Sequence, residues 1–200
     1  RVLPIVERLA RELPIPVSVD TSKPEVMRQA VRAGAGLIND VRALQMPGAL
    51  DAAVASRLPV CLMHIQGEPS TMQQEPHYDD VVAEVYTFLA ERVRVCEAAG
   101  IPGERILVDP GFGFGKTLDH NLRLLRHLDC FSDLAAGVLA GISRKSMIGL
   151  LLNAPVDQRL SGSLAAAVIA LWQGATIIRT HDVRETVQAL CVCAAVQATW

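Results

Sequence analysis

The sequence predicts an α/β protein built on a parallel sheet that helices cover. Six short runs rich in β-branched residues alternate with longer amphipathic or alanine-rich stretches. This alternation of strand and helix is typical of parallel sheets. Half of the 200 residues are hydrophobic, and aromatic residues are scarce. A chain of this length buries one substantial core, so we expect a single domain over residues 1–200.

The elements follow in order along the chain. The opening residues 1–16 read as a helix that leads into the first strand. The predicted strands are 16–20, 36–40, 59–64, 106–110, 137–143 and 176–181. The predicted helices between them are 23–33, 47–56, 79–99, 121–128 and 162–173. Several of the helices are followed by glycine, which favours a helix end.

Composition excludes several classes of protein. The formal net charge is −2, and long runs of Lys or Arg are absent, which argues against nucleic acid and membrane surfaces as partners. No apolar run is long enough to span a bilayer, and the opening residues do not resemble a secretory signal. The five cysteines are odd in number and lack CxxC spacing, so we expect reduced thiols. We therefore expect a cytoplasmic protein whose partners are small molecules.

Polar or ionisable side chains stand at the end of nearly every predicted strand. Parallel strands place these ends on one rim, where α/β barrels and doubly wound sheets build their sites. Asn39 and Asp40 are neighbours, so only one of them can face that rim, and alternation does not choose between them. A (β/α)8 barrel has eight strands and about 250 residues. The fold is therefore either an open sheet or a barrel whose two missing units lie upstream of Arg1.

The stretch "LVDPGFGFGK", residues 107–116, joins a strand end to a glycine-rich loop. Its spacing fits neither the Walker P-loop nor the dinucleotide fingerprint. Asp109 could accept hydrogen bonds from a flat heterocycle while a phenylalanine contacts a second substrate. Alternatively, Asp109 caps the loop, and Phe112 and Phe114 pack under a helix. These two interpretations stand about even.

Two further stretches carry basic groups at strand ends. In "GISRKSMIG", Ser143, Arg144 and Lys145 could bind an anion or a carbonyl. Taken alone, a solvated basic turn is the favoured explanation, but a helix start disfavours cations, which shifts the balance somewhat toward function. In "RTHDV", Arg179 and His181 lie on one face of the last strand, where barrels often bind phosphate. His64 is expected in the core or behind the site. Hydrolase triads, HExxH and Cys/His clusters are absent.

Taken together, "VDTSKPEV", "INDVRAL", "VCLMHIQGEPSTMQ", "DPGFGFGK", "SRKSMIG" and "RTHDV" closely resemble the dihydropteroate synthase family over essentially the whole chain. The resemblance implies a (β/α)8 TIM barrel, represented here by about six units, strands 3 to 8, and hence an N-terminally incomplete domain. It implies a transferase that joins p-aminobenzoate to 6-hydroxymethyl-7,8-dihydropterin pyrophosphate. It also implies Mg2+ as cofactor, sulfonamide inhibitors and a homodimer.

The resemblance also assigns residues. The implied pterin-binding residues are Asp20, Asn39, Met63, Asp109, Gly113 and Lys145. The implied p-aminobenzoate-binding residues are Phe112, Phe114, Ser143 and Arg144, and the pyrophosphate-binding residues are Arg179 and His181. The catalytic set implied is Asp20, Asp109, Lys145, Arg179 and His181. The metal ligand of the family has no counterpart here and would lie upstream of Arg1.

Two other functions remain alternatives. One is a non-catalytic pterin-binding protein, although such a protein would not need the basic residues of "SRKS" and "RTHD". The other is a methyltransferase domain with a similar barrel, whose methylated folate substrate carries no pyrophosphate.

Overall fold

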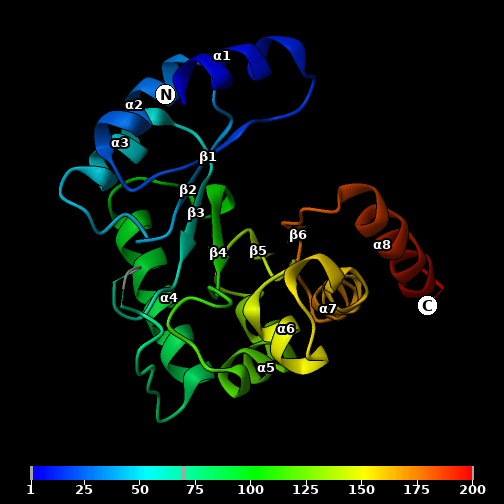
Figure 1. Ribbon diagram of the computed structural model, residues 1–200. Coiled ribbons are helices and arrows are strands. Elements are labelled where there is room, and N and C mark those ends of the chain that lie inside the picture. Colours follow the sequence, from blue (N-terminus) through cyan, green and yellow to red (C-terminus); the bar gives the residue numbers. More distant parts are fainter. Residues whose placement is uncertain (1, 69–70, 200) are drawn as a thin grey trace.

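The computed structural model describes residues 2–68 and 71–199. Six parallel strands form one curled sheet, and each strand pairs with the next along the chain, so β1 and β6 lie at its two ends (Figure 1). The strands are β1 (Ser18–Asp20), β2 (Leu37–Asp40), β3 (Val60–Met63), β4 (Ile106–Asp109), β5 (Gly137–Ala140) and β6 (Ile177–Ile178). All six predicted strands are present, each shorter than the sequence pattern indicated.

Helices connect successive strands and cover one face of the sheet, with a further helix before β1 and another after β6 (Figure 1). They are α1 (Leu3–Glu12), α2 (Pro24–Arg32), α3 (Ala49–Ser56), α4 (Val81–Ala98), α5 (Leu118–Arg126), α6 (Ser146–Leu152), α7 (Leu160–Trp172) and α8 (Val183–Gln197). Short 3-10 turns are η1 (Gly103–Arg105), η2 (Leu128–Phe131) and η3 (Val156–Gln158). In the described part of the chain, no helix is both long and apolar enough to cross a membrane.

Helix α8 was not among the predicted elements. Several of its apolar side chains are exposed, including Val187 and Val192, so it lacks the single buried stripe by which helices are recognised in a sequence. Its contacts are mainly with α7.

Strand register divides the sheet into two faces. Residues such as Ile38, Leu62 and Val108 point toward the helices and are fully buried. The alternate residues point to the opposite face, because side chains along a strand change face at every step. On that face Asp20 is aligned with Asn39, and Met63 is aligned with Asp109. Asp20, Asn39 and Asp109, three of the polar residues predicted at the strand ends, therefore share one face.

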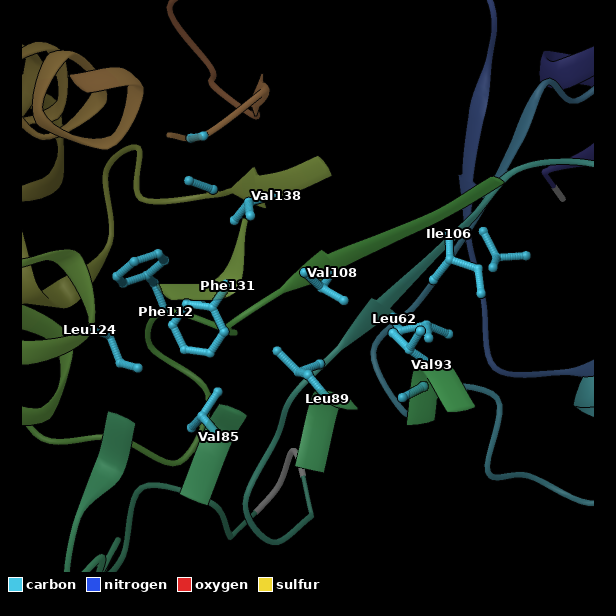
Figure 2. Packing of buried hydrophobic residues seen from close by; sticks show 14 of the residues in the cluster. Leu62, Val85, Leu89, Val93, Ile106, Val108, Phe112, Leu124, Phe131 and Val138 are labelled. Carbon is cyan, nitrogen blue, oxygen red and sulfur yellow. The ribbon is translucent and has the colours of Figure 1, made fainter. Parts of the chain in front are cut away.

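The hydrophobic core lies between the sheet and its helices. Figure 2 shows Leu62, Val108 and Val138 of the strands beside Val85 and Leu89 of α4. All of these side chains are at 0% exposure. The tight packing fixes the positions of the strands, and hence of the polar groups at their carboxyl ends.

Replacing Leu89 with alanine tests this core. Removing a fully buried leucine side chain leaves a cavity, so the free energy of unfolding should fall by about 2–5 kcal/mol. Urea unfolding monitored by circular dichroism measures the change. Val192→Ala on α8 is the control: its side chain is 67% exposed, and the expected change is within about 0.5 kcal/mol. Equal losses in the two variants would contradict this description of the core.

Candidate functional site

The choice between Asn39 and Asp40 is decided by strand phase. Asn39 Nδ2 donates to Asp20 Oδ2 at 2.8 Å, so these side chains lie together on the face away from the helices. Asp40 points the other way and is fully buried. Its carboxylate accepts from the Ser22 hydroxyl and from the main-chain N–H groups of Arg42 and Leu44, both at 2.9 Å. Asp40 therefore joins the loop after β1 to the loop after β2, on the helix-covered side of the sheet.

The structure confirms the interpretation in which Asp109 caps the loop, and the two carboxylate oxygens have different surroundings. Oδ1 accepts from the main-chain N–H of Gly111 at 2.7 Å and so caps the loop. Oδ2 has no hydrogen-bond partner, although the side chain is only 1% exposed. Asn39 Oδ1 is the other buried side-chain atom without a partner in the described residues. Two buried acceptors on one face are thus available to a hydrogen-bond donor.

Cations surround these acceptors. Arg179, just after β6, places Nη1 3.5 Å from Asp20 Oδ2 and Nη2 3.9 Å from Asp109 Oδ2. Burial raises the pKa of Asp109, while Lys145, the Gly111 N–H, Arg179 and Lys116 oppose the rise. Burial also lowers the pKa of Lys145 to about 8, against the attraction of Asp109. The site thus contains hydrogen-bond acceptors, which suit a ligand that donates hydrogen bonds. It also contains positively charged side chains, which suit an anionic group.

A cavity of about 300 Å³ adjoins Asp20, Lys145 and Arg179, whereas Asn39 and Asp109 are not among its lining residues. Its lining residues are Asp20, Gly141, Ser143, Lys145, Arg179, Thr180 and His181. Five of these seven residues were assigned to the site in the sequence analysis. Gly141 was not: a Cβ there would lie 3.1 Å from Arg179 Nε, so the missing side chain leaves room for the guanidinium group.

The glycine-rich loop 111–115 is held by side chains from outside it. Four successive main-chain carbonyls accept a hydrogen bond, those of Phe112, Gly113, Phe114 and Gly115. Their donors, in the same order, are Lys145, Gln73, Lys116 and Tyr78. Because each of these carbonyls accepts a hydrogen bond from a different side chain, the loop is held in one defined backbone conformation.

The two phenylalanines of the loop have different surroundings. Phe114 is half-buried, and Lys145 Nζ lies 4.6 Å from the centre of its ring. Phe112 is 0% exposed and belongs to the hydrophobic core (Figure 2). The structure thus places Phe112 differently from its assignment to the p-aminobenzoate pocket, since the ring turns toward the helices after Gly111. Met63, assigned to the pterin pocket, is also fully buried.

Arg144, assigned to the p-aminobenzoate pocket, is paired with another residue. Its Nε donates to Asp182 Oδ2 at 3.0 Å, and Nη2 donates to the other carboxylate oxygen, so the guanidinium is occupied by Asp182. Arg144 does not line the cavity. Ser143 Oγ lies 3.0 Å from His181 Nδ1 and accepts from the His181 N–H at 3.2 Å. These contacts link the loop after β5 to the loop after β6, and Asp182 was not among the residues predicted from the sequence.

The described residues do not fit a metal centre held by protein side chains. Across residues 2–68 and 71–199, no three His, Cys, Asp or Glu side chains lie together as such a centre would need. Asp20, the exposed carboxylate at the cavity, is already paired with Asn39 and Arg179.

Comparisons with known proteins agree with this geometry. A family model described as "Pterin binding enzyme" matches residues 1–181. Dihydropteroate synthase of Escherichia coli (strain K12) is 57% identical over 192 residues, which cover 96% of this chain and 68% of the relative. The Haemophilus influenzae dihydropteroate synthase is 52% identical, with 96% and 70% covered.

Solved structures show the same similarity. The Yersinia pestis dihydropteroate synthase with a sulfonamide drug complex superposes with a TM-score of 0.97 at 52% identity, covering 100% of this chain and 73% of that one. The Xanthomonas albilineans enzyme in complex with 7,8-dihydropteroate gives 0.94 at 53% identity, covering 100% and 74%.

The consecutive order of the six parallel strands, together with the superposition on dihydropteroate synthase structures, places the chain in the class of α/β-barrel proteins, as a curled part of such a barrel. Within that class, the chain belongs to the dihydropteroate synthase family of pterin-binding enzymes.

Gly111→Ala tests the fit of the loop. Gly111 has φ +74°, and an added Cβ would lie 1.9 Å from the His64 carbonyl oxygen, so the loop would have to move. We expect a loss of about 2–4 kcal/mol in the free energy of unfolding, from strain together with the clash. Gly100→Ala is the matched control, because its φ of +99° carries the strain but no atom lies within 4 Å of the added Cβ. If chemical unfolding gave the two variants equal losses, close packing at Gly111 would be refuted.

Proposed function

We propose that this chain binds the substrates of dihydropteroate synthase, in which p-aminobenzoate displaces pyrophosphate from 6-hydroxymethyl-7,8-dihydropterin pyrophosphate to give 7,8-dihydropteroate. The observation that carries the proposal is the pair of buried acceptors without partners, Asn39 Oδ1 and Asp109 Oδ2. The edge of a pterin ring offers ring N–H and amino donors to such a pair. Lys145, beside them, can donate to the ring carbonyl or a ring nitrogen.

The basic side of the cavity suits the pyrophosphate group. Arg179 and His181 both line it and come from the chain after β6. A guanidinium presents a planar fork of donors to phosphate oxygens. Arg179 reaches Asp20 and Asp109 as well, so it lies between the position proposed for the pterin and that proposed for its leaving group.

The p-aminobenzoate position is proposed beside Phe114 and Ser143. Phe114 is the partly exposed ring of the loop, and Ser143 lines the cavity. Phe112 would support the loop from the core, and Arg144 would bind the benzoate carboxylate only by exchanging it for Asp182.

The proposed chemistry is electrostatic. As the bond from the exocyclic methylene to pyrophosphate breaks, positive charge spreads into the pterin, and negative charge develops on the departing oxygen. Asp20 and Asp109 favour the cationic ring, while Arg179, and His181 when protonated, favour the anion. The amino nitrogen of p-aminobenzoate then forms the new C–N bond, and the proton that it loses passes to solvent.

We propose Mg2+ as a cofactor. Mg2+ is usually bound through substrate phosphates, waters and one or two carboxylates, so the described residues alone would bind it weakly. Calorimetric titration of pyrophosphate with and without MgCl2 tests this proposal. Equal affinities would contradict it.

Sulfonamide sensitivity, a cytoplasmic location and a homodimer are proposed as well. A sulfonamide should compete with p-aminobenzoate, as the Yersinia pestis complex suggests.

All five cysteines are unpaired thiols, which supports a reducing compartment. The dimer proposal rests on apolar side chains exposed on α6 and α7, which include Leu150, Leu151, Ile169 and Trp172. Light scattering on the purified chain measures the oligomeric state.

Asp109→Asn tests the assignment of the pterin site. The amide keeps the shape but can place an NH2 group where the ligand needs an acceptor, so pterin affinity should fall by about 2–3 kcal/mol. Pyrophosphate affinity should change much less. Isothermal titration with 6-hydroxymethyl-7,8-dihydropterin pyrophosphate, and separately with pyrophosphate, measures both.

Asp119→Asn on α5 is the control, because this carboxylate is exposed and lies outside the cavity. It should leave both affinities unchanged. Equal losses of the two ligands in Asp109→Asn would refute the division of the site into a pterin part and a pyrophosphate part.

A further inference from the structure

Ser143 and His181 meet where the loops after β5 and β6 run beside each other. In the sheet, Leu139 of β5 is aligned with Ile177 of β6, 38 positions further along the chain. Ser143 and His181 are also 38 positions apart. The register of the two strands therefore continues into the two loops, and it places a hydroxyl group beside an imidazole ring.

A turn at Arg144 holds Ser143 in this place. Arg144 has φ +59°, in the left-handed region that residues other than glycine rarely adopt. Its main-chain N–H donates to Ser163 Oγ at 3.0 Å, and its carbonyl accepts from Arg159 Nη1 at 3.0 Å. Its guanidinium binds Asp182 of the loop after β6. Backbone strain of this kind persists only where the surrounding contacts hold it, so the position of Ser143 is well defined.

The hydrogen bonds of Ser143 indicate which ring nitrogen of His181 carries the proton. Ser143 is 8% exposed, and its Oγ accepts from the His181 main-chain N–H at 3.2 Å. The same Oγ lies 3.0 Å from His181 Nδ1. In the described part of the chain the hydroxyl has no other partner, so both groups are satisfied when Oγ donates to Nδ1. The neutral ring then carries its proton on Nε2.

The Nε2 atom is the part of the His181 ring that is left for a ligand. His181 is exposed and lines the cavity together with Arg179. An N–H group at Nε2 can donate to the oxygens of a phosphate or pyrophosphate group, whereas an unprotonated Nε2 presents a lone pair to the anion. The tautomer therefore decides whether the neutral ring favours or disfavours an anion in the cavity.

We propose that Ser143 is a positioning residue for His181: its hydroxyl donates to Nδ1, keeps the imidazole proton on Nε2 and so lets the uncharged ring donate to the departing pyrophosphate. The catalytic part of this inference rests on the proposed function, in which pyrophosphate leaves beside Arg179 and His181. The tautomer itself depends on no ligand. A serine that only joined the two loops would leave the ring free to carry its proton on either nitrogen.

A direct contact between Ser143 and the anion is the competing role. Ser143 lines the cavity, and a hydroxyl at the cavity wall can donate to a bound anion. In that case Ser143 and His181 would contribute to binding independently. The proposal instead makes the contribution of Ser143 depend on the presence of the His181 ring, and this difference can be measured.

The first experiment needs no ligand. Long-range 1H–15N correlation spectra of the 15N-labelled chain, recorded on the alkaline side of the imidazole titration, show which ring nitrogen is protonated. The His181 signals are those that disappear in His181→Gln. We expect Nε2 alone to be protonated in the unaltered chain, and a second population protonated on Nδ1 to appear in Ser143→Ala. A protonated Nδ1 in the unaltered chain, or a single tautomer in folded Ser143→Ala, would overturn the proposal.

Three further variants separate the tautomer from effects on the fold. Ser161→Ala removes an exposed hydroxyl of α7 and should leave the His181 signals unchanged. Ser143→Thr keeps the hydroxyl, so a single tautomer protonated on Nε2 is expected. If Ser143→Ala gives no cooperative thermal transition, Ser143→Gly also lacks the hydroxyl and should show the second population. A folded Ser143→Gly protein with one tautomer would contradict the proposal.

The second experiment measures pyrophosphate affinity by isothermal titration calorimetry at the same pH. Ser143→Ala should weaken binding about three- to tenfold, the effect of one lost hydrogen bond. In a His181→Ala background the same substitution should change the affinity by less than about twofold, because the ring through which Ser143 acts is absent. Equal losses in the two backgrounds would show that Ser143 acts without His181 and would refute the proposal.

The two experiments distinguish this inference from the proposed function. Failure of the unaltered chain to bind pyrophosphate would count against the proposed function. The spectra of the ligand-free chain would still decide whether Ser143 sets the tautomer of His181.

Discussion

The carboxylate of Asp109 lies at the end of β4 with 1% of its surface exposed, and one of its oxygens has no hydrogen-bond partner. Burying such a group costs free energy unless cations and donors surround it. Arg179 comes to it from the chain after β6, Lys145 from the start of α6, and the Gly111 N–H from its own loop. The curled sheet brings these three segments together. The groups that stabilise the Asp109 carboxylate are therefore in place only when the sheet has this shape.

This dependence explains why the loop after β4 is so heavily constrained. Gly111 turns the chain at a positive φ against the His64 carbonyl, which directs its N–H to Asp109 Oδ1. The same turn sends Phe112 into the core and leaves Phe114 partly exposed. One short segment therefore holds the carboxylate, contributes to the core and presents a ring to the site.

Much of this arrangement was predictable from the sequence. The alternation of strand and helix gave all six strands, and the polar strand ends gave the rim that carries Asp20, Asp109 and Arg179. Boundaries were less accurate, because strand ends depend on hydrogen bonds to neighbouring strands rather than on local composition. The choice of Asn39 over Asp40 required the family resemblance, since either phase of a four-residue strand satisfies alternation.

Other features could not be predicted because they depend on pairing between distant segments. Lys116 meets His64 across 52 positions of the chain, and Arg144 meets Asp182 across 38. Each residue alone reads as an ordinary surface charge or turn. Phe112 and Phe114 look equivalent in the sequence, and only the direction of the chain after Gly111 separates them.

The contacts between the loops after β5 and β6 have a consequence for how such sequences can diverge. Arg144 and Asp182 form a two-point ion pair, and Ser143 and His181 meet beside it. Loss of either charge would leave the other residue without its ion-pair partner. Once one of the two residues has been substituted, a substitution of the other therefore costs less stability than it would alone. The two positions should therefore vary together among relatives.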